Sequence, residues 1–406
     1  MTDTDNQDKR TLREVASEAC KCIDVGVAVL PKLLLNEDVY ASTVRSEFNA
    51  IVVEHHMKWA PLCQDLPGPI EEGTESTRVG RYDFHHCDQI VDFGLRHGMK
   101  VKGHVLVWHV TTPSWVQNMT AEELSEQIRR HIFTTMGHFR GRIKYWDVVN
   151  EALAPDGSLA KNIFLEKLGP GYIEQCFRWA HEADPNAFLI YNDNKVEGCG
   201  LGDHSRKADA FYELLKNLKA KNTPVHGAGI QAHFNAAGVG LQRPPTPIAV
   251  KRQIRRLGDL GLRVNISEMD VRISKLPMDE NMRTNAQCDI YRDIVCAALS
   301  ESSFDGIWLW GFTDAHTWIK HFYYDGDQPL LFDKDFKKKK SYYAFRDALG
   351  TLSVGGIVGG KQKLFQRNDE LEPWGKLWMQ PEPNIVSDKS SNILPSGDSN
   401  PDWLQR

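Results

Sequence analysis

The sequence lacks the features of a nucleic-acid-binding or membrane protein. Its 406 residues carry 49 basic and 54 acidic side chains, and the sequence pI is about 6.3. This balance offers no positive surface to a phosphate backbone, and no apolar run approaches the roughly 20 residues that span a bilayer. We therefore expect neither nucleic acid nor a membrane as a partner.

A secretory signal is also missing from the first residues as given. Residues 1–10 are polar, and no apolar stretch follows a basic start. The N-terminus alone therefore predicts either a protein that stays inside the cell or a chain that has lost a leader.

Cysteine patterns that indicate disulfides or zinc are scarce as well. The eight cysteines are scattered without a C-x-x-C pair, and a chain of this length does not need disulfides to be stable. We expect free thiols, with Cys176, Cys288 and Cys296 as small core residues. The Cys20-x-Cys22 pair leaves a metal site or a distant disulfide open, but zinc sites normally have a second such pair or two histidines. The sequence predicts neither a bound metal nor a cofactor.

The sequence does contain a regular alternation of short apolar runs with helical stretches. Hydrophobic residues make up 41% of the chain, enough for one large α/β barrel or two ordinary domains. Helices between the runs have clear N-terminal signals, such as the capping box of Thr120 and Glu123 and the Thr246-Pro247 pair. Eight runs are strand candidates: residues 25–30, 49–53, 100–108, 145–149, 188–192, 227–231, 262–267 and 306–310. Eight strands alternating with helices predict a TIM (β/α)8 barrel.

The two ends of the chain differ from the barrel region in composition. We predict a polar N-terminal segment at residues 1–20, a single barrel domain at residues 21–350 and a Gly/Pro/Ser-rich tail at residues 351–406. The tail shows no sustained period, which favours an extended or disordered segment. Residues 370–380 hold its few large apolar side chains, too few for a carbohydrate-binding module.

Two glutamates stand at strand ends on opposing sides of the predicted barrel. Glu151 follows the fourth run and Glu268 the seventh, and barrel enzymes place reactive groups at this end of their strands. A single such glutamate is equally explained by a structural ion pair. Two carboxyl groups that meet across the mouth are what glycosidic cleavage needs: one donates a proton to the leaving oxygen, and the other, ionised, attacks the sugar carbon or activates water.

Several neighbours of these glutamates suit a sugar site. The amide of Asn150 can hold the hydroxyl beside the reacting carbon, and His233 can hydrogen-bond an ionised nucleophile. His104 is open to a structural reading, as a neutral ring satisfied by backbone carbonyls. Other aromatic residues near strand ends are either core residues or platforms for pyranose rings: Trp108, Trp310 and Trp318.

Six separated motifs carry a family resemblance. They read E-H-H-M-K-W at 54–59, G-H-V-L-V-W-H at 103–109, W-D-V-V-N-E-A at 146–152, G-I-Q-A-H at 229–233, I-S-E-M-D at 266–270, and W-G-F-T-D at 310–314 followed by Trp318. In this order they closely resemble glycoside hydrolase family 10, whose best-known members are endo-β-1,4-xylanases. The resemblance spans residues 22–349.

The resemblance implies a role for each matching residue. It implies a retaining enzyme with Glu151 as acid/base and Glu268 as nucleophile, their carboxyl groups about 5 to 5.5 Å apart. His109 and Asp270 look like supports behind the substrate contacts, and no metal is implied. The substrate contacts, mainly at the glycone subsites, map onto Glu54, His55, Lys58, His104, Trp108, Asn150, Gln231, His233, Trp310 and Trp318.

Two positions depart from the family pattern. The family usually reads E-N-E-M-K-W, so His55 replaces an asparagine that binds sugar. The family motif N-D-Y-N-x-E reads N-D-N-K-V-E at 192–197, so Asn194 replaces a tyrosine commonly found near the leaving-group side. Both changes concern subsite contacts, which decide the preferred polymer and its decorations rather than the chemistry.

These observations predict a monomeric endo-1,4-β-xylanase that hydrolyses internal bonds of xylan by a retaining double displacement. A related β-glycanase with another polymer preference and a non-catalytic polysaccharide-binding protein are the alternatives. A metal-dependent barrel hydrolase is disfavoured, because no clustered histidine and aspartate set is evident. A polymeric substrate favours an extracellular enzyme, in tension with the N-terminus.

Overall fold

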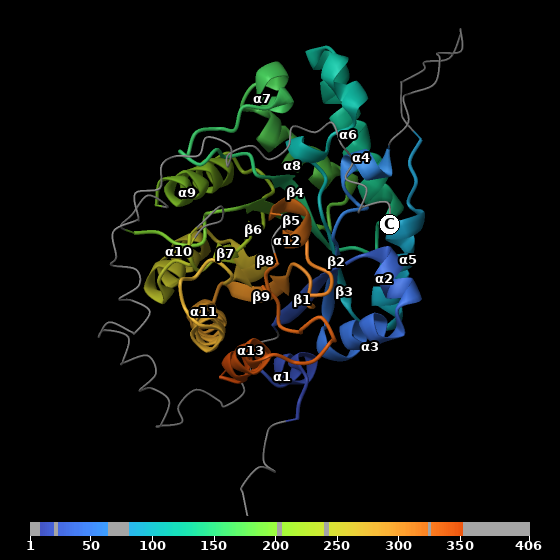
Figure 1. Cartoon of the computed structure of the whole chain (residues 1–406). Coiled ribbons are helices and arrows are strands. Elements are labelled where there is room, and N and C mark those ends of the chain that lie inside the picture. Colours follow the sequence, from blue (N-terminus) through green and yellow to red (C-terminus); the bar gives the residue numbers. More distant parts are fainter. Residues whose placement is uncertain are drawn as a thin grey trace, which may run out of the picture.

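Parallel strands pair side by side around a closed ring, and helices surround that ring (Figure 1). The computed structural model describes residues 9–19, 23–63, 81–200, 205–238, 243–323 and 326–351. The predicted tail, apart from residue 351, and the Cys20-x-Cys22 pair lie outside the described residues. The predicted (β/α)8 barrel is confirmed.

The ring contains all eight predicted strands. Its order is β6-β5-β4-β3-β2-β1-β9-β8, and a pairing of β6 with β8, in which Gly227 lies opposite Arg263, closes it. The strands are β1 (Asp24–Val29), β2 (Ala50–Val53), β3 (Lys100–Gly103), β4 (Tyr145–Asn150), β5 (Phe188–Asp193), β6 (Gly227–Ile230), β8 (Arg263–Arg272) and β9 (Phe304–Leu309), with the short β7 (His233–Asn235) beside β8.

Two strands differ in length from the sequence-based expectation. Strand β3 ends at Gly103 rather than near Trp108, although the amides of Leu106 and Val107 still donate to the carbonyls of Asp147 and Val148. Strand β8 continues to Arg272 because β7 pairs with its last residues. Glu268 therefore lies within a strand and not after one, which gives its backbone a rigid support.

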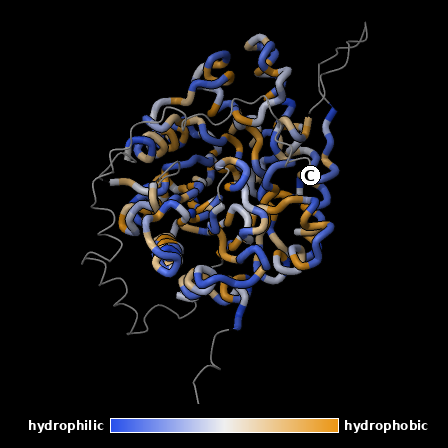
Figure 2. The backbone as a smooth tube through the Cα atoms, in the orientation of Figure 1, coloured by the Kyte–Doolittle hydropathy of each residue, from blue (hydrophilic) through white to orange (hydrophobic). Residues whose placement is uncertain are grey.

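Helices cover the outside of the barrel, and hydrophobic and hydrophilic residues alternate along them (Figure 2). The longer helices are α3 (Asp38–Glu47), α5 (His85–Arg96), α6 (Ala121–His138), α8 (Tyr172–Ala183), α9 (Ser205–Ala220), α10 (Pro247–Asp259), α11 (Glu280–Leu299) and α13 (Lys340–Gly350). The short helical elements are α1 (Leu12–Glu18), α2 (Pro31–Asn36), α4 (Trp59–Leu62), η1 (His109–Thr111), η2 (Ser114–Asn118), α7 (Ile163–Leu168) and α12 (Ile319–Tyr323). The capping box predicted for Thr120 and Glu123 begins α6, and Thr246 caps α10.

Helix α1 lies inside residues 1–20, the segment that the composition separates from the barrel. Leu12, Val15 and Ala16 are buried in the same core as the barrel, and α1 packs against α13. The described part of this segment therefore belongs structurally with the barrel, while the domain boundaries themselves stay a prediction.

The described cysteines are free thiols, as expected. Cys176 is fully buried, as expected, whereas Cys288 and Cys296 on α11 are only partly buried, although Cys296 packs against the core. No helix in the described ranges is long and apolar enough to cross a bilayer.

Candidate active site

The two predicted carboxyl groups emerge at the same end of the barrel from β4 and β8. Glu151 directly follows β4, and its backbone amide donates to the carbonyl of Asn192 at 3.0 Å. Its carboxylate accepts one hydrogen bond from the indole Nε1 of Trp108 at 3.0 Å and another from Nε2 of Gln231 at 2.8 Å. Both donors are neutral, and among the described residues no cation forms an ion pair with Glu151.

Glu268 is held in a different way. Its side chain is 5% exposed, and its two oxygens contact Nδ2 of Asn192 at 2.7 Å and Nε2 of His233 at 3.1 Å. Burial raises the pKa of Glu268, but the hydrogen bond from His233 and the nearby positive charge of His104, His233 and Lys102 outweigh it and bring the pKa to about 2. Glu268 is therefore ionised across the ordinary pH range.

His233 owes its charge to a second carboxylate behind it. Its Nδ1 contacts Oδ2 of Asp270 at 2.8 Å, and the same oxygen accepts a hydrogen bond from the indole of Trp318 at 2.7 Å. Burial lowers the pKa of His233, but Asp270 and Glu268 together raise it to about 10. His233 is thus an imidazolium between two carboxylates, which explains how a buried Glu268 keeps its negative charge.

A row of amide side chains connects the two glutamates. Asn192 donates from the same Nδ2 to Glu268 and, at 2.9 Å, to Oδ1 of Asn150. Gln231 donates to Glu151 and, at 3.3 Å, to that Asn150 oxygen. Glu151 and Glu268 therefore belong to one hydrogen-bonded network.

Lys58 brings a positive charge to the other side of the mouth. Its Nζ lies 4.9 Å from the ring centre of Trp108 and 5.8 Å from that of Trp310. Burial lowers the pKa of Lys58, while Glu268, Glu54 and Glu151 oppose the shift. Burial raises the pKa of Glu54 to about 7, opposed by Lys58 and assisted by the charge of Glu268. The predicted residues Lys58 after β2, Trp108 after β3 and Trp310 after β9 therefore lie close together.

A buried carboxylate, Asp147, holds the ring of His104 in place. Its Nδ1 contacts Oδ2 of Asp147 at 3.0 Å, and the buried Lys102 shares that oxygen at the same distance. Its ring meets Trp310 edge-on, with centroids 5.1 Å apart. The structural reading expected backbone carbonyls as the hydrogen-bond partners of His104. Its partner in the structure is instead the carboxylate of Asp147.

Two further predicted residues lie at the edge of this network. His109 begins η1 immediately after Trp108, and burial lowers its pKa, opposed by the charge of Glu151. His55 lies between Glu54 and His56, and burial together with Lys58 lowers its pKa to about 2, so its ring is neutral. In the structure both are near the site, and neither side chain directly holds Glu151 or Glu268.

Sequence reasoning missed Asn192 and Ser267. The hydroxyl of Ser267 donates to Oδ1 of Asn192 at 2.6 Å, so the amide nitrogen of Asn192 must face Glu268 and Asn150. A Cβ on Gly229 would lie 2.3 Å from Oδ1 of Asn192, so only glycine fits there. The polar N-D pair at the end of the fifth apolar run is the signal that could have included Asn192.

Backbone strain gathers at this end of the barrel. Glu151 and Ala232 have φ of 54° and 65°, a left-handed conformation that costs a non-glycine residue roughly 1–3 kcal/mol and that clusters at functional positions. The buried Glu197 accepts the amide of Ala232 at 2.8 Å and thereby holds the turn between Gln231 and His233.

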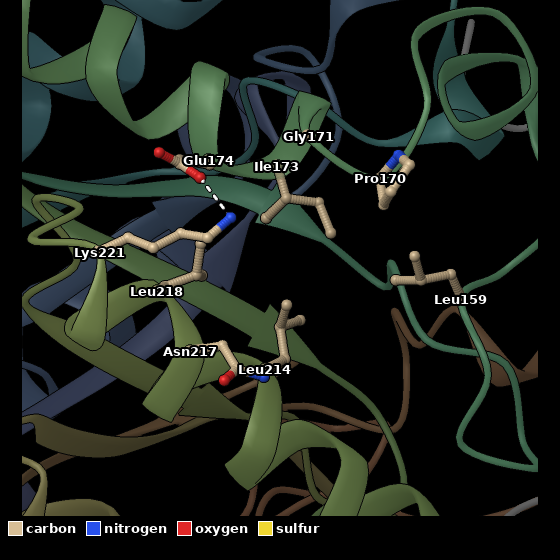
Figure 3. Close-up of a pocket in the computed structure, with 9 residues that line it drawn as sticks. All are labelled: Leu159, Pro170, Gly171, Ile173, Glu174, Leu214, Asn217, Leu218 and Lys221. Carbon is tan, nitrogen blue, oxygen red and sulfur yellow. Dashed lines mark hydrogen bonds and ion pairs between the residues drawn. The ribbon is translucent and has the colours of Figure 1, made fainter.

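A pocket of about 190 Å³ on the helical layer is separate from this network. It lies along α8 and α9, and the Glu174–Lys221 ion pair lies beside its aliphatic side chains, which include Ile173 and Leu218 (Figure 3). It contains none of the predicted site residues and no unpaired reactive group. In the described part of the chain, no three His, Cys, Asp or Glu side chains gather as metal ligands.

The site described above contains one carboxylate that is ionised and one carboxyl group that neutral donors orient. These are the two functions that cleavage of a glycosidic bond requires.

Comparisons with known proteins agree with this chemistry. Endo-1,4-beta-xylanase B of Thermotoga neapolitana is 34% identical over 318 residues, which cover 78% of this chain and 85% of that protein. A beta-1,4-xylanase of Dictyoglomus thermophilum is 35% identical over 323 residues, covering 76% and 84%. The crystal structure of native xylanase 10B from Thermotoga maritima superimposes with a TM-score of 0.74 at 35% identity, covering 84% of this chain and 99% of that one. The model of glycosyl hydrolase family 10 matches residues 11–348, and the chain belongs to this family.

Proposed function

We propose that the protein is an endo-1,4-β-xylanase that cleaves internal β-1,4-xylosidic bonds by double displacement, with Glu268 as nucleophile and Glu151 as acid/base. The observation that carries the proposal is the buried, ionised Glu268, linked through Asn192, Asn150 and Gln231 to Glu151. The xylanases among its relatives support xylan as the substrate.

In the first step, an oxygen of Glu268 forms a bond to the anomeric carbon while the bond from that carbon to the bridging oxygen breaks. Glu151 gives its proton to that oxygen, so the leaving chain departs with a hydroxyl group. The imidazolium of His233 keeps Glu268 ionised before the attack.

In the second step, Glu151 is a carboxylate and takes a proton from water. The water oxygen attacks the anomeric carbon, the ester bond to Glu268 breaks, and Glu268 returns as a carboxylate. Trp108 and Gln231 hold Glu151 in both steps. No metal or cofactor takes part.

The remaining predicted residues are proposed to bind the sugar. We assign Asn150 to the hydroxyl beside the anomeric carbon. The Lys58 ammonium, which is buried near the rings of Trp108 and Trp310, is assigned to another hydroxyl. Asp270 and His109 are proposed to orient the residues that contact the substrate without contacting it themselves. The proposed substrate contacts are Glu54, His55, Lys58, His104, Trp108, Asn150, Gln231, His233, Trp310 and Trp318.

Removal of each carboxylate tests the assigned roles. Glu151→Ala should lose roughly 10²–10⁴-fold in kcat/KM on xylan, the contribution of general acid–base catalysis, and Glu268→Ala at least as much. On an activated aryl β-xyloside with azide, Glu268→Ala should form the α-xylosyl azide and Glu151→Ala the β-xylosyl azide, because azide replaces the nucleophile in one and the water in the other.

The control is Glu126→Ala, which removes an exposed carboxylate on α6 and should leave the rate unchanged. If neither variant yields an azide adduct, or if the two anomers are exchanged, the roles of Glu151 and Glu268 are wrongly assigned.

A panel of polymers tests the substrate. We expect reducing sugar from xylan, with internal cleavage of xylo-oligosaccharides. Reducing sugar from a glucan or mannan but not from xylan would favour the alternative β-glycanase, whose specific support is His55 in place of the family's asparagine. Binding without turnover would identify a polysaccharide-binding protein.

A further inference from the structure

The two backbone amides that follow Glu151 donate to side chains of the neighbouring strand, β5. The amide of Ala152 donates to the hydroxyl of Tyr191 at 3.2 Å. The amide of Leu153 donates to Oδ2 of Asp193 at 3.3 Å. Glu151 itself has a φ of 54°, a left-handed conformation that persists only where surrounding contacts hold it. The turn that carries Glu151 is therefore held by side chains from another strand.

These two side chains are joined to each other and to α9. The hydroxyl of Tyr191 donates to Oδ2 of Asp193 at 2.7 Å, and Oδ1 of Asp193 pairs with Nζ of Lys207 on α9 at 2.8 Å. Tyr191 and Asp193 are fully buried, and Lys207 is 3% exposed. One hydroxyl, that of Tyr191, therefore bridges a buried carboxylate and the backbone next to Glu151.

Tyr191 and Asp193 lie behind the site rather than on the substrate side. Successive side chains of a strand point to opposite faces of the sheet, and Asn192, which lies between them, contacts Glu268 inside the barrel. The ring of Tyr191 instead packs against Phe211 of α9, with centroids 5.4 Å apart. The two side chains therefore affect the reaction only through the residues that they hold.

A buried ion pair is an inefficient way to stabilise a barrel. Desolvation of Asp193 and Lys207 offsets much of their attraction, and an apolar pair of similar volume is often at least as stable. An apolar pair, however, cannot accept an amide or orient a hydroxyl. This arrangement suits the exact placement of Glu151, whose proton must lie within hydrogen-bond distance of the leaving oxygen.

We propose that Tyr191 and Asp193 are positioning residues for the acid/base: they fix the turn at Glu151 and so direct its carboxyl group at the leaving oxygen. This inference rests on the proposed function. A displacement of about 1 Å in a reacting group can cost on the order of a hundredfold in rate. Trp108 and Gln231 hold the carboxylate itself, so loss of the backbone support should impair proton transfer without abolishing it.

The test compares two aryl β-xylosides that differ in their leaving group. Phenol leaves well only when it is protonated as the bond breaks, whereas dinitrophenolate leaves without a proton. The value of kcat/KM reports the first step, in which Glu151 is the acid. Tyr191→Phe removes only the hydroxyl. It should lower kcat/KM roughly tenfold on the phenyl xyloside and less than about twofold on the dinitrophenyl xyloside.

Tyr342→Phe is the matched control. The hydroxyl of Tyr342 on α13 also donates to a buried carboxylate, that of Glu47, at 2.7 Å, and it accepts from Nζ of Lys338 at 2.9 Å. Its loss should lower the urea midpoint of unfolding by a similar amount but leave the ratio of the two kcat/KM values unchanged. Asp193→Asn keeps the side-chain shape and loses one acceptor, so it should show the same selective loss as Tyr191→Phe.

A double variant tests whether Tyr191 acts through Glu151. Residues that act as a unit have non-additive effects, so Tyr191→Phe added to Glu151→Ala should cause no further loss on the phenyl xyloside. A further loss of roughly tenfold, the full effect of the single variant, would show that Tyr191 acts elsewhere and would overturn the inference.

Two other results would also overturn it. An unchanged kcat/KM on the phenyl xyloside in Tyr191→Phe would show that the turn does not need the hydroxyl. An equal loss on both xylosides would show that the hydroxyl supports the fold rather than proton transfer. An equal loss on both xylosides in Glu151→Ala would instead contradict the acid role in the proposed function, whatever Tyr191 does.

Discussion

Glu54 and Glu268 show that the neighbours of a buried carboxyl group decide its charge. Burial favours the neutral form of both side chains. Glu268 has a hydrogen-bonded imidazolium against it, and its pKa falls to about 2. Glu54 has Lys58 nearby but also the charge of Glu268, and its pKa rises to about 7. The hydrogen bond from His233, together with the charges of His104 and Lys102, therefore keeps Glu268 ionised, whereas Glu54 titrates near neutrality.

Replacement of His233 should move the acid limb of the pH–rate profile upward. The folded-state pKa of Glu268 is depressed, so in the wild type Glu268 stays ionised until the pH falls toward 2. In His233→Phe the burial remains and the hydrogen bond is lost, so the pKa of Glu268 should rise to its usual range or above. We expect kcat/KM on an aryl β-xyloside to decline below about pH 5 in this variant, where the wild type is still flat.

His181→Phe, on the exposed side of α8, is the matched control and should keep the wild-type profile. Circular dichroism at each pH separates loss of ionisation from unfolding. An acid limb at the wild-type position in His233→Phe would mean that His104 and Lys102 alone keep Glu268 charged.

Two helices of this barrel, α1 and α6, begin at a capping signal that is local in the sequence. Thr11 with Glu14 and Thr120 with Glu123 form complete capping boxes, and each box uses residues three positions apart. Such contacts need no tertiary partner, and the capping box of Thr120 was predictable from the sequence for this reason. Strand β8 is different, because its last residues are strand only through their pairing with β7.

Loss of the α6 capping box should reduce stability without affecting catalysis. Thr120→Ala removes the oxygen that accepts the amide of Glu123 at 3.2 Å, which should cost about 1 kcal/mol and lower Tm by about 1–2 °C in a domain of this size. Calorimetry and kcat/KM on xylan measure the two effects.

The same substitution inside a helix, Thr284→Ala in α11, is the comparison. Within the described ranges, its hydroxyl donates only to the carbonyl of Glu280 in its own helix, so stability should be unchanged or slightly higher. Equal destabilisation by both substitutions would mean that the capping box contributes nothing specific.

A buried carboxylate links the first and the last helix of the described chain. Glu47, 3% exposed at the end of α3, accepts the amide of Leu12 at 3.0 Å and the hydroxyl of Tyr342 at 2.7 Å, and it pairs with Lys338 at 2.8 Å. It therefore joins α1 and α13, which come from opposite ends of the described chain.

Glu47→Ala should destabilise the whole barrel by about 3 kcal/mol, because a buried amide, a hydroxyl and an ammonium lose their acceptor at once. Urea unfolding measures this change. Glu126→Ala breaks an exposed pair with Arg130 and should cost less than about 0.5 kcal/mol. Similar urea midpoints of unfolding for the two variants would show that the contacts of Glu47 between α1 and α13 do not stabilise the barrel.

Much of this molecule was readable from local patterns. The eight strands, the barrel class and the position of Glu151 directly after β4 depend on short runs of residues and on their alternation with helices, which can be seen without tertiary contacts. Glu268 was expected after its strand but lies within β8, because the pairing with β7 lengthens that strand. The helix α1 was not predicted because its apolar residues are few and become a core face only in the fold, where they pack against α13, α3 and β1.

The protonation states and the orientation of the site side chains could not be read in this way. Glu268 meets His233 across 35 positions of the chain and Asn192 across 76, and Ser267 orients Asn192 from another strand. Electrostatic and hydrogen-bond energies depend on distances of a few ångströms, and the closure of the ring sets those distances. Local sequence motifs therefore identify the candidate catalytic residues. The charge that each one carries depends on the neighbours that the closed barrel brings close to it.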